Sequence, residues 1–197
     1  MTYTLKREEL GNGLLASVLE ALAKAYKEIG AEVYVVGAAA RDLSLKLLGA
    51  GSAPRRTMDL DVAVLLEKWD EYERLTEILI KDGFVKAPEK QRFYYCGIEN
   101  VRYEVDIVPF GDIAQEEMVA WPPEGNPVMS VRCFADVMKN ADKVSVEDRF
   151  DFRMASLSGQ WLIKLDAWCD RRLMTRKDAA DMQFILENAY ITLALSS

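Results

Sequence analysis

The spacing of apolar residues predicts alternating helices and strands over the first half of the chain. Residues 13–29 place leucine, valine and tyrosine side chains at helical intervals, and Gly30 supplies the stop. Short β-branched runs that end at glycine or at turn residues indicate buried strands. The predicted order is a helix at residues 13–29, a strand at 31–38, a helix at 40–49, a strand at 58–66 and a helix at 68–84.

The second half of the chain has a less regular pattern. Residues 92–111 predict two strands with a turn at Glu99 and Asn100. Residues 129–146 predict a short strand and a helix, and residues 160–190 are strongly helical. This order predicts an α/β or α+β domain with a helical C-terminal part.

Composition narrows the chemistry that the chain can perform. The 197 residues carry a net charge of -7, which disfavours a general nucleic-acid coat, because such proteins have basic surfaces. The absence of histidine excludes Ser-His and Cys-His catalysis and any zinc site that needs imidazole. Cys96, Cys133 and Cys169 are widely spaced and odd in number, so we expect reduced thiols. Carboxylates, lysine, arginine, hydroxyls or a bound metal must carry the chemistry.

The sequence also bears on location. No apolar run is long enough to span a bilayer, and the first ten residues include acidic side chains and lack the apolar segment of a signal peptide. We therefore expect a cytoplasmic protein with no membrane association.

Carboxylates interrupt two of the predicted strands. Asp59 and Asp61 are two residues apart, so they share one face of a strand, and Glu104 and Asp106 do the same in a later strand. A lone Asp-x-Asp is most simply a strand end whose carboxylates are solvated or paired with Arg55 or Arg56. If the two strands are neighbours, however, Asp106 approaches the first pair, and three convergent carboxylates favour Mg²⁺ or Mn²⁺.

A glycine turn lies ahead of the first carboxylate pair. The segment YVVGAAARDL, residues 34–43, reads as strand, glycine, small residues and helix. Gly37 allows the backbone to approach a ligand closely, and the N–H groups at the start of the following helix suit phosphate. Such a turn is a weak signal alone, but together with the carboxylates it favours a functional site over a solvated strand end.

These motifs together resemble the nucleotidyltransferase superfamily related to DNA polymerase β. GAAARD, then RRTMDLD, then EVDI follow the family order of glycine turn, Asp-x-Asp and a third aspartate on a neighbouring strand. The GAAARD turn is also similar to that of tRNA nucleotidyltransferases. The C-terminal stretch WLIKLDAWCDRRLMTRKDAADMQFIL is similar to the signature of the AbiEii/AbiGii toxin-type branch, whose members include toxins of toxin–antitoxin and phage-defence systems.

The resemblance implies a fold and a division of the chain. The expected fold is a nucleotidyltransferase-type mixed sheet flanked by helices, with a C-terminal helical part. The nucleotidyltransferase core is expected at residues 1–115. An irregular segment and the C-terminal helices, packed on that core, are expected at residues 116–197.

The resemblance also implies an activity and its residues. The activity is transfer of a nucleotide from an NTP to an acceptor hydroxyl on the 3′ end of tRNA, a protein or a small molecule, with Mg²⁺ or Mn²⁺ as cofactor and a cognate antitoxin as a possible partner. Asp59, Asp61 and Asp106 are implied as catalytic residues and metal ligands. The implied nucleotide-binding residues are Gly37, Ala38, Arg41, Arg56, Thr57, Lys164, Lys177, Asp178 and Asp181.

Two departures from the family pattern leave an alternative open. Ala38 stands where many members have serine or a second glycine, so backbone N–H groups must hold the phosphate alone. The segment 39–58 is also longer than in minimal members. The alternative is a non-catalytic nucleotide-binding or regulatory protein that keeps the fold. The cations around Arg171 and Arg176 are likewise either a solvated helix face or a grip for a phosphate-bearing acceptor.

Overall fold

The computed structural model of the chain describes residues 1–10, 13–49, 59–96 and 102–195. Its helices are η1 (Arg7–Leu10, a 3₁₀ turn), α1 (Gly13–Glu28), α2 (Gly37–Leu47), α3 (Trp69–Lys81), α4 (Phe134–Lys139), α5 (Leu157–Arg171) and α6 (Lys177–Leu195). Its strands are β1 (Thr2–Leu5), β2 (Tyr34–Val36), β3 (Asp59–Leu65), β4 (Phe84–Lys86), β5 (Arg92–Cys96), β6 (Arg102–Phe110), β7 (Met118–Ala120), β8 (Val128–Ser130), β9 (Asp142–Val146) and β10 (Phe150–Met154).

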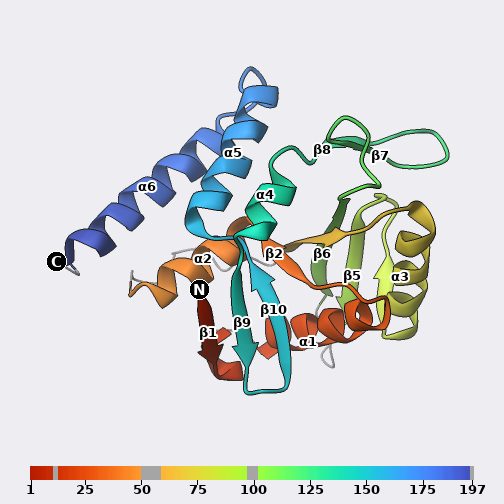
Figure 1. The fold of residues 1–197 in the computed structure, drawn as a ribbon, viewed down its shortest axis with the longest axis horizontal. Coiled ribbons are helices and arrows are strands. Elements are labelled where there is room, and N and C mark those ends of the chain that lie inside the picture. The colour runs from red at the N-terminus through yellow and green to blue at the C-terminus, as the bar shows by residue number, and fades with distance from the viewer. Residues whose placement is uncertain (11–12, 50–58, 97–101, 196–197) are drawn as a thin grey trace.

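The central feature is a mixed eight-stranded sheet with the order β1-β9-β10-β2-β3-β6-β5-β4. Figure 1 shows it from β1 on one side to β5 on the other. The β3–β6 pair at its centre is parallel, and each of these strands has an antiparallel partner on its other side. β7 and β8 form a separate antiparallel pair. The expected mixed sheet flanked by helices is therefore present.

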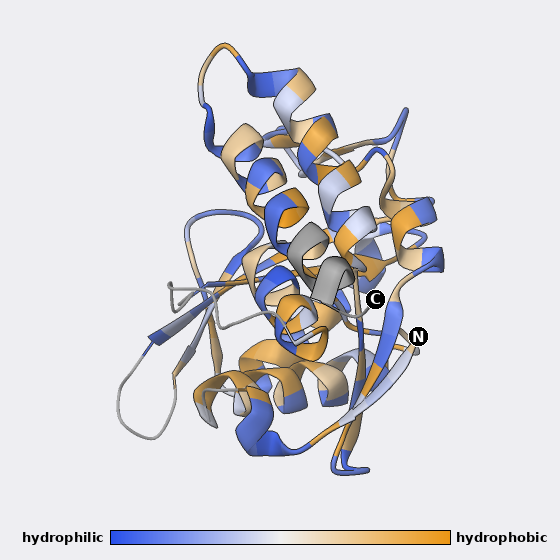
Figure 2. Cartoon of the chain, turned by 90° about the vertical axis from the view of Figure 1, so that its left-hand side faces the viewer, coloured by the Kyte–Doolittle hydropathy of each residue, from blue (hydrophilic) through white to orange (hydrophobic). Residues whose placement is uncertain are grey.

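The two faces of the sheet are covered by different helices. Leu60 and Val62 of β3 belong to the core that also contains α1 and α3, while Ala63 joins a second core with α4 and α5. This division follows from the pleat, since successive side chains of a strand point to opposite faces. α6 packs beside α5, and the two form a helical hairpin above the sheet (Figure 1). Apolar and polar residues alternate along both helices of this hairpin (Figure 2).

Several predicted elements differ in detail from those observed. The helix predicted at 40–49 begins three residues earlier, at Gly37, so the glycine turn and the helix start coincide. The irregular second region supplies β9 and β10, and β10 pairs with β2, so the sheet takes strands from both sides of residue 115. The division at that position stays a prediction. The turn predicted at Glu99 and Asn100 lies outside the described residues.

Local signals explain where several helices begin and end. Ser156 caps α5 by accepting a hydrogen bond from the backbone N–H of Gly159 (3.2 Å). Gly30 follows α1 with φ of +75°, a backbone conformation that glycine adopts without strain. Ser156 thus marks the start of α5, and Gly30 marks the end of α1.

Candidate active site

Four carboxylates share one face at the centre of the sheet. In the parallel β3–β6 pair, Asp59 lies opposite Glu104 and Asp61 lies opposite Asp106. The strands are neighbours, which was the condition for Asp106 to approach the Asp59 and Asp61 pair. Residues opposite each other in a sheet have side chains on one face, so the structure places the three predicted aspartates on the same face of two neighbouring strands.

The glycine turn is pressed against the second of these aspartates. Gly37 has φ of +66°, and a Cβ built on it would lie 2.2 Å from Asp61 Oδ2. Any side chain at this position would collide with the carboxylate and would also require an unfavourable backbone conformation. Glycine is thus required by the packing of β2 and α2 against β3. Ala38 follows in the first turn of α2, where backbone N–H groups lack partners within the helix.

Asp61 is the electrostatic centre of the carboxylate face. Its pKa is raised from 3.8 to about 6, first by burial and then by the negative charges of Asp106 and Asp59, while Lys164 and Lys177 oppose the shift. Like charges held together without a cation between them are costly. The donor set, which consists of carboxylate oxygens alone, suits a hard divalent cation.

Asp106 is engaged by an arginine that the sequence reasoning missed. Arg92 lies opposite Asp106 in the β5–β6 pair, and its Nε and Nη2 donate to the two carboxylate oxygens at 2.8 and 2.9 Å. Its Nη2 also lies 2.8 Å from Glu104 Oε1. The sequence did offer one signal. Side chains alternate between two faces along residues 92–96, and pairing this segment with residues 102–110 as a hairpin would place Arg92 on the face of Asp106. Within the described ranges, no group of three Asp, Glu or Cys side chains is arranged to hold a metal ion.

A cavity of about 190 Å³ opens beside Asp61, between β2, α2, α5 and α6, and Asp59 and Asp106 do not line it. Gly37 and Asp61 lie at this cavity together with Arg41, Lys164 and Asp181. Its remaining wall is largely apolar and is formed by Val36, Val108, Phe134, Gln160, Ile163, Ala167, Arg171 and Ile185. Residues predicted from widely separated motifs therefore line one space.

Ion pairs fix the charged side of this cavity. Lys164 Nζ lies 2.7 Å from Asp181 Oδ2 and 3.6 Å from Asp178 Oδ1, and Arg41 Nη1 lies 3.2 Å from Asp181 Oδ1. Asp178 is fully buried and accepts two hydrogen bonds from Arg171, which hold the pKa of its carboxyl below the usual value. Asp178 and Asp181 thus orient the cations Arg41, Lys164 and Arg171.

The remaining predicted residues have different positions. Lys177 begins α6 and does not line the cavity, although its charge lowers the pKa of Asp61. Arg56 and Thr57 lie outside the described residues. In the cationic cluster, Arg171 is paired with Asp178, and the Arg172 guanidinium lies 5.8 Å from the ring centre of Trp168.

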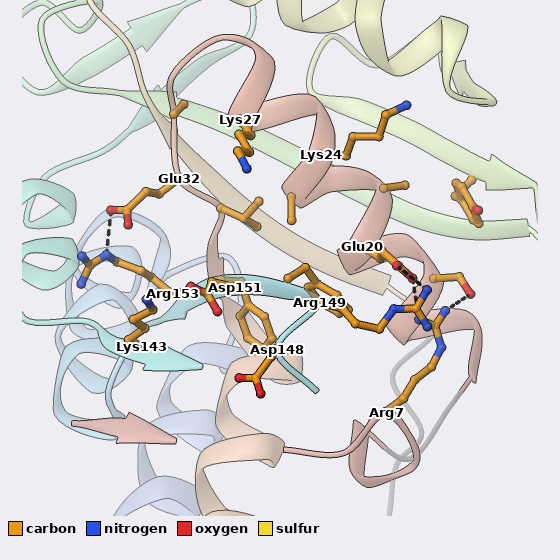
Figure 3. Close-up of a pocket in the computed structure, with 18 residues that line it drawn as sticks. Arg7, Glu20, Lys24, Lys27, Glu32, Lys143, Asp148, Arg149, Asp151 and Arg153 are labelled. Atoms are coloured by element: carbon orange, nitrogen blue, oxygen red, sulfur yellow. Dashed lines mark hydrogen bonds and ion pairs between the residues drawn. The ribbon is translucent and has the colours of Figure 1, made fainter. Parts of the chain in front are cut away.

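A larger cavity of about 860 Å³ lies on the α1 side of the molecule (Figure 3). Side chains of both charges surround it, and several are paired with each other, as Arg153 is with Glu32 and Arg7 with Glu20. None of the predicted catalytic aspartates lines it. The smaller cavity is therefore the candidate active site.

The described helices include none that is both long enough and apolar enough to cross a membrane.

Comparison with solved structures identifies the fold. The chain is similar to an antigenic nucleotidyltransferase-like protein from Paracoccidioides brasiliensis, with 17% identity over 95% of this chain and 78% of that one and a TM-score of 0.55. At this identity the likeness shows the fold alone. The chain has the fold of a nucleotidyltransferase-like protein, as expected.

Other solved structures match less well. A lincosamide antibiotic adenylyltransferase with lincomycin bound has 16% identity and a TM-score of 0.46, over 92% of this chain and 96% of that one. The Thermotoga maritima CCA-adding enzyme in complex with tRNA has 24% identity and a TM-score of 0.33, over 52% of this chain and 23% of that one. No protein-family model matches the chain. No curated protein matches it significantly.

Proposed function

We propose that the protein is a metal-dependent nucleotidyltransferase that moves an NMP from an NTP to an acceptor hydroxyl. The observation that carries the proposal is the placement of Asp59, Asp61 and Asp106 on one face of two neighbouring strands, with Asp61 beside the turn at Gly37 and a cavity lined by Lys164. A solvated strand end would need neither the close approach of a glycine nor a cavity at this place.

Each part of the site has a role in this proposal. The backbone N–H groups at the start of α2, from Gly37 and Ala38 onward, hold the β- and γ-phosphates. Lys164 and Arg41 balance phosphate charge from positions that Asp181 fixes. The apolar wall of the cavity is available to the nucleoside.

The carboxylates supply the metal site and activate the acceptor. Asp59 and Asp61 would hold Mg²⁺ or Mn²⁺, and Asp106 would join them or accept the acceptor proton. When bound, such a cation stabilises negative charge on the attacking and leaving oxygens of a phosphoryl transfer. The raised pKa of Asp61, which comes from burial first and from the charges of Asp106 and Asp59 second, supports this assignment, because a bound cation would favour the charged carboxylate.

The finer assignment rests on the C-terminal helices. Lys164, Lys177, Asp178 and Asp181 follow the signature of the AbiEii/AbiGii toxin-type branch, and we propose a cytoplasmic enzyme of that branch. Its acceptor would be the 3′ end of tRNA, a protein or a small molecule. A cognate antitoxin is the expected partner, and co-purification with the product of a neighbouring gene would test this.

Transfer of label from NTPs tests the function. The protein is incubated with the four α-³²P-labelled NTPs, Mg²⁺ and a mixture of cellular RNA, protein and small molecules. We expect labelled acceptor from the native chain and none from Asp59→Ala or Asp61→Ala. Asp112→Ala is the matched control, because Asp112 is an exposed aspartate just beyond the far end of β6. Equal labelling by the native chain and Asp61→Ala would exclude the catalytic role.

The second candidate is a nucleotide-binding protein without turnover, and the alanine at position 38 is the feature that favours it. In that case an NTP would raise the melting temperature in the presence of Mg²⁺, because a ligand of the native state stabilises it, but no acceptor would be labelled. Absence of any thermal shift with every nucleotide would contradict both functions.

A further inference from the structure

Arg92 occupies both oxygens of the third candidate aspartate. Its Nε–H and Nη2–H donate to Asp106 Oδ1 and Oδ2 at 2.8 and 2.9 Å, which is the parallel two-bond geometry of the strongest arginine–carboxylate pairs. Both side chains are mostly buried, since 25% of Arg92 and 21% of Asp106 is exposed. A divalent cation approaching Asp106 would meet the positive guanidinium at short range.

The strand register makes this contact part of the site. Arg92 lies opposite Asp106 across β5–β6, and Asp106 lies opposite Asp61 across β6–β3. The three side chains therefore form a row on one face of three adjacent strands. Arg92 also contacts Glu104, so the one guanidinium group pairs with both carboxylates of β6.

We propose that Arg92 is a positioning residue that competes with the divalent cation for Asp106. With no metal bound, the guanidinium holds Asp106 away from Asp59 and Asp61. Completion of the three-aspartate site requires Asp106 to leave Arg92 and turn toward the cation. The freed guanidinium then lies at the edge of the site, where it can face phosphate oxygens. This inference rests on the proposed function, because it assumes that the aspartates hold metal.

Metal affinity measured without nucleotide tests the competition. Free Mn²⁺ is followed by electron paramagnetic resonance during titration of the native chain and of Arg92→Gln, which removes the charge and keeps similar length. We expect the variant to bind Mn²⁺ about tenfold more tightly, since an arginine that engages both carboxylate oxygens no longer has to be displaced. Arg92→Lys, which keeps the charge but loses the paired geometry, should fall between them.

Arg102→Gln is the matched control for charge. Arg102 lies on the same face of β6 as Asp106, and its guanidinium lies 5.7 Å from the Tyr94 ring centre. Arg102→Gln removes the same charge from the neighbouring strand, so any general electrostatic gain appears in both variants. We expect the affinity of Arg102→Gln for Mn²⁺ to stay within about twofold of the native value, because an exposed charge is screened.

The outcomes separate this inference from the proposed function. Native and Arg92→Gln chains that bind Mn²⁺ equally would overturn the competition and leave the metal site standing, as would weaker binding by the variant. No binding by either chain would overturn both proposals.

A measurement on the native chain covers the case in which Arg92→Gln does not fold. The Arg92 Nε–H gives a side-chain ¹⁵N–¹H resonance that the bond to Asp106 shifts and protects from exchange. We expect saturating Mg²⁺ to move this resonance and speed its exchange. A resonance unchanged at saturating Mg²⁺ would show that Arg92 keeps Asp106 and would overturn the proposal.

Discussion

Replacing Asp61 by asparagine should stabilise the metal-free protein. Burial and the neighbouring charges of Asp106 and Asp59 raise the pKa of Asp61 from 3.8 to about 6. One pKa unit is worth about 1.4 kcal/mol, so the charged carboxylate costs the folded state about 3 kcal/mol at neutral pH. Asparagine keeps the shape of the side chain without the charge, and Asp61→Asn should gain up to about 3 kcal/mol.

The pH dependence of the gain gives the sign of the effect. The pKa of Asp61 is higher in the folded state than in the unfolded state. The native chain is therefore as stable as Asp61→Asn below about pH 3.8, and it becomes less stable than the variant as the pH rises through about 6. The gain from Asp61→Asn should be full at pH 7.5 and about 1 kcal/mol at pH 4.5.

Urea denaturation in EDTA at the two pH values provides the assay. Asp59→Asn serves as a control, because the side chain of Asp59 is exposed and its removal should change stability by less than about 1 kcal/mol. A variant at position 61 that is no more stable than the native chain at pH 7.5, or whose gain is the same at pH 4.5, would refute the electrostatic reasoning.

Three further substitutions test other parts of the structure. Gly37→Ala should lower the free energy of unfolding by at least about 2 kcal/mol in urea, because the new Cβ would lie 2.2 Å from Asp61 Oδ2 and φ is +66°. Lys86→Met should add about 1 kcal/mol at pH 7, after allowance for solvent screening, because burial lowers the pKa of Lys86 to about 8. That gain should shrink as the pH rises from about 8 toward 10.5, and a constant gain would contradict it. Asp178→Asn should cost about 2 kcal/mol in urea, since a neutral buried amide with a single oxygen can accept only one of the two charged hydrogen bonds that Arg171 donates, and a neutral result would contradict that role.

The strongly periodic elements could be predicted from the sequence. The helix predicted at 13–29 is α1 at Gly13–Glu28, and the helix predicted at 68–84 is α3 at Trp69–Lys81, because each buries one continuous apolar stripe. The strand containing Asp59 and Asp61 was recognisable because its other positions are apolar, and all of them except Leu65 are buried. Local pattern was sufficient wherever the core lies directly beneath the element.

Non-local pairing accounts for what the pattern missed. β1 at Thr2–Leu5 is a short, largely polar edge strand that exists by pairing with β9, whose residues lie 141 positions away in the register. β9 and β10 likewise depend on each other and on β2. Strand preference depends more on neighbours than on intrinsic propensity, so such segments carry a weak local signal.

The candidate site divides in the same way. The carboxylates and Gly37 were recognisable from types and spacing, because each sits within a strand or turn that has a local signature. The pairing of Arg92 with Asp106 was not, since it depends on the register of β5 against β6. The cavity shared by Gly37, Lys164 and Asp181 likewise depends on how the α5–α6 hairpin packs on α2.

The position of the transferred label tests the central claim most directly. Parallel reactions contain Mg²⁺, cellular acceptors and the same NTP labelled at either the α- or the γ-phosphorus. Nucleotidyl transfer predicts that the acceptor gains α-label alone, that γ-label is released as pyrophosphate, and that Asp59→Ala abolishes both. Transfer of γ-label to the acceptor, or α-labelling that persists in Asp59→Ala, would contradict it.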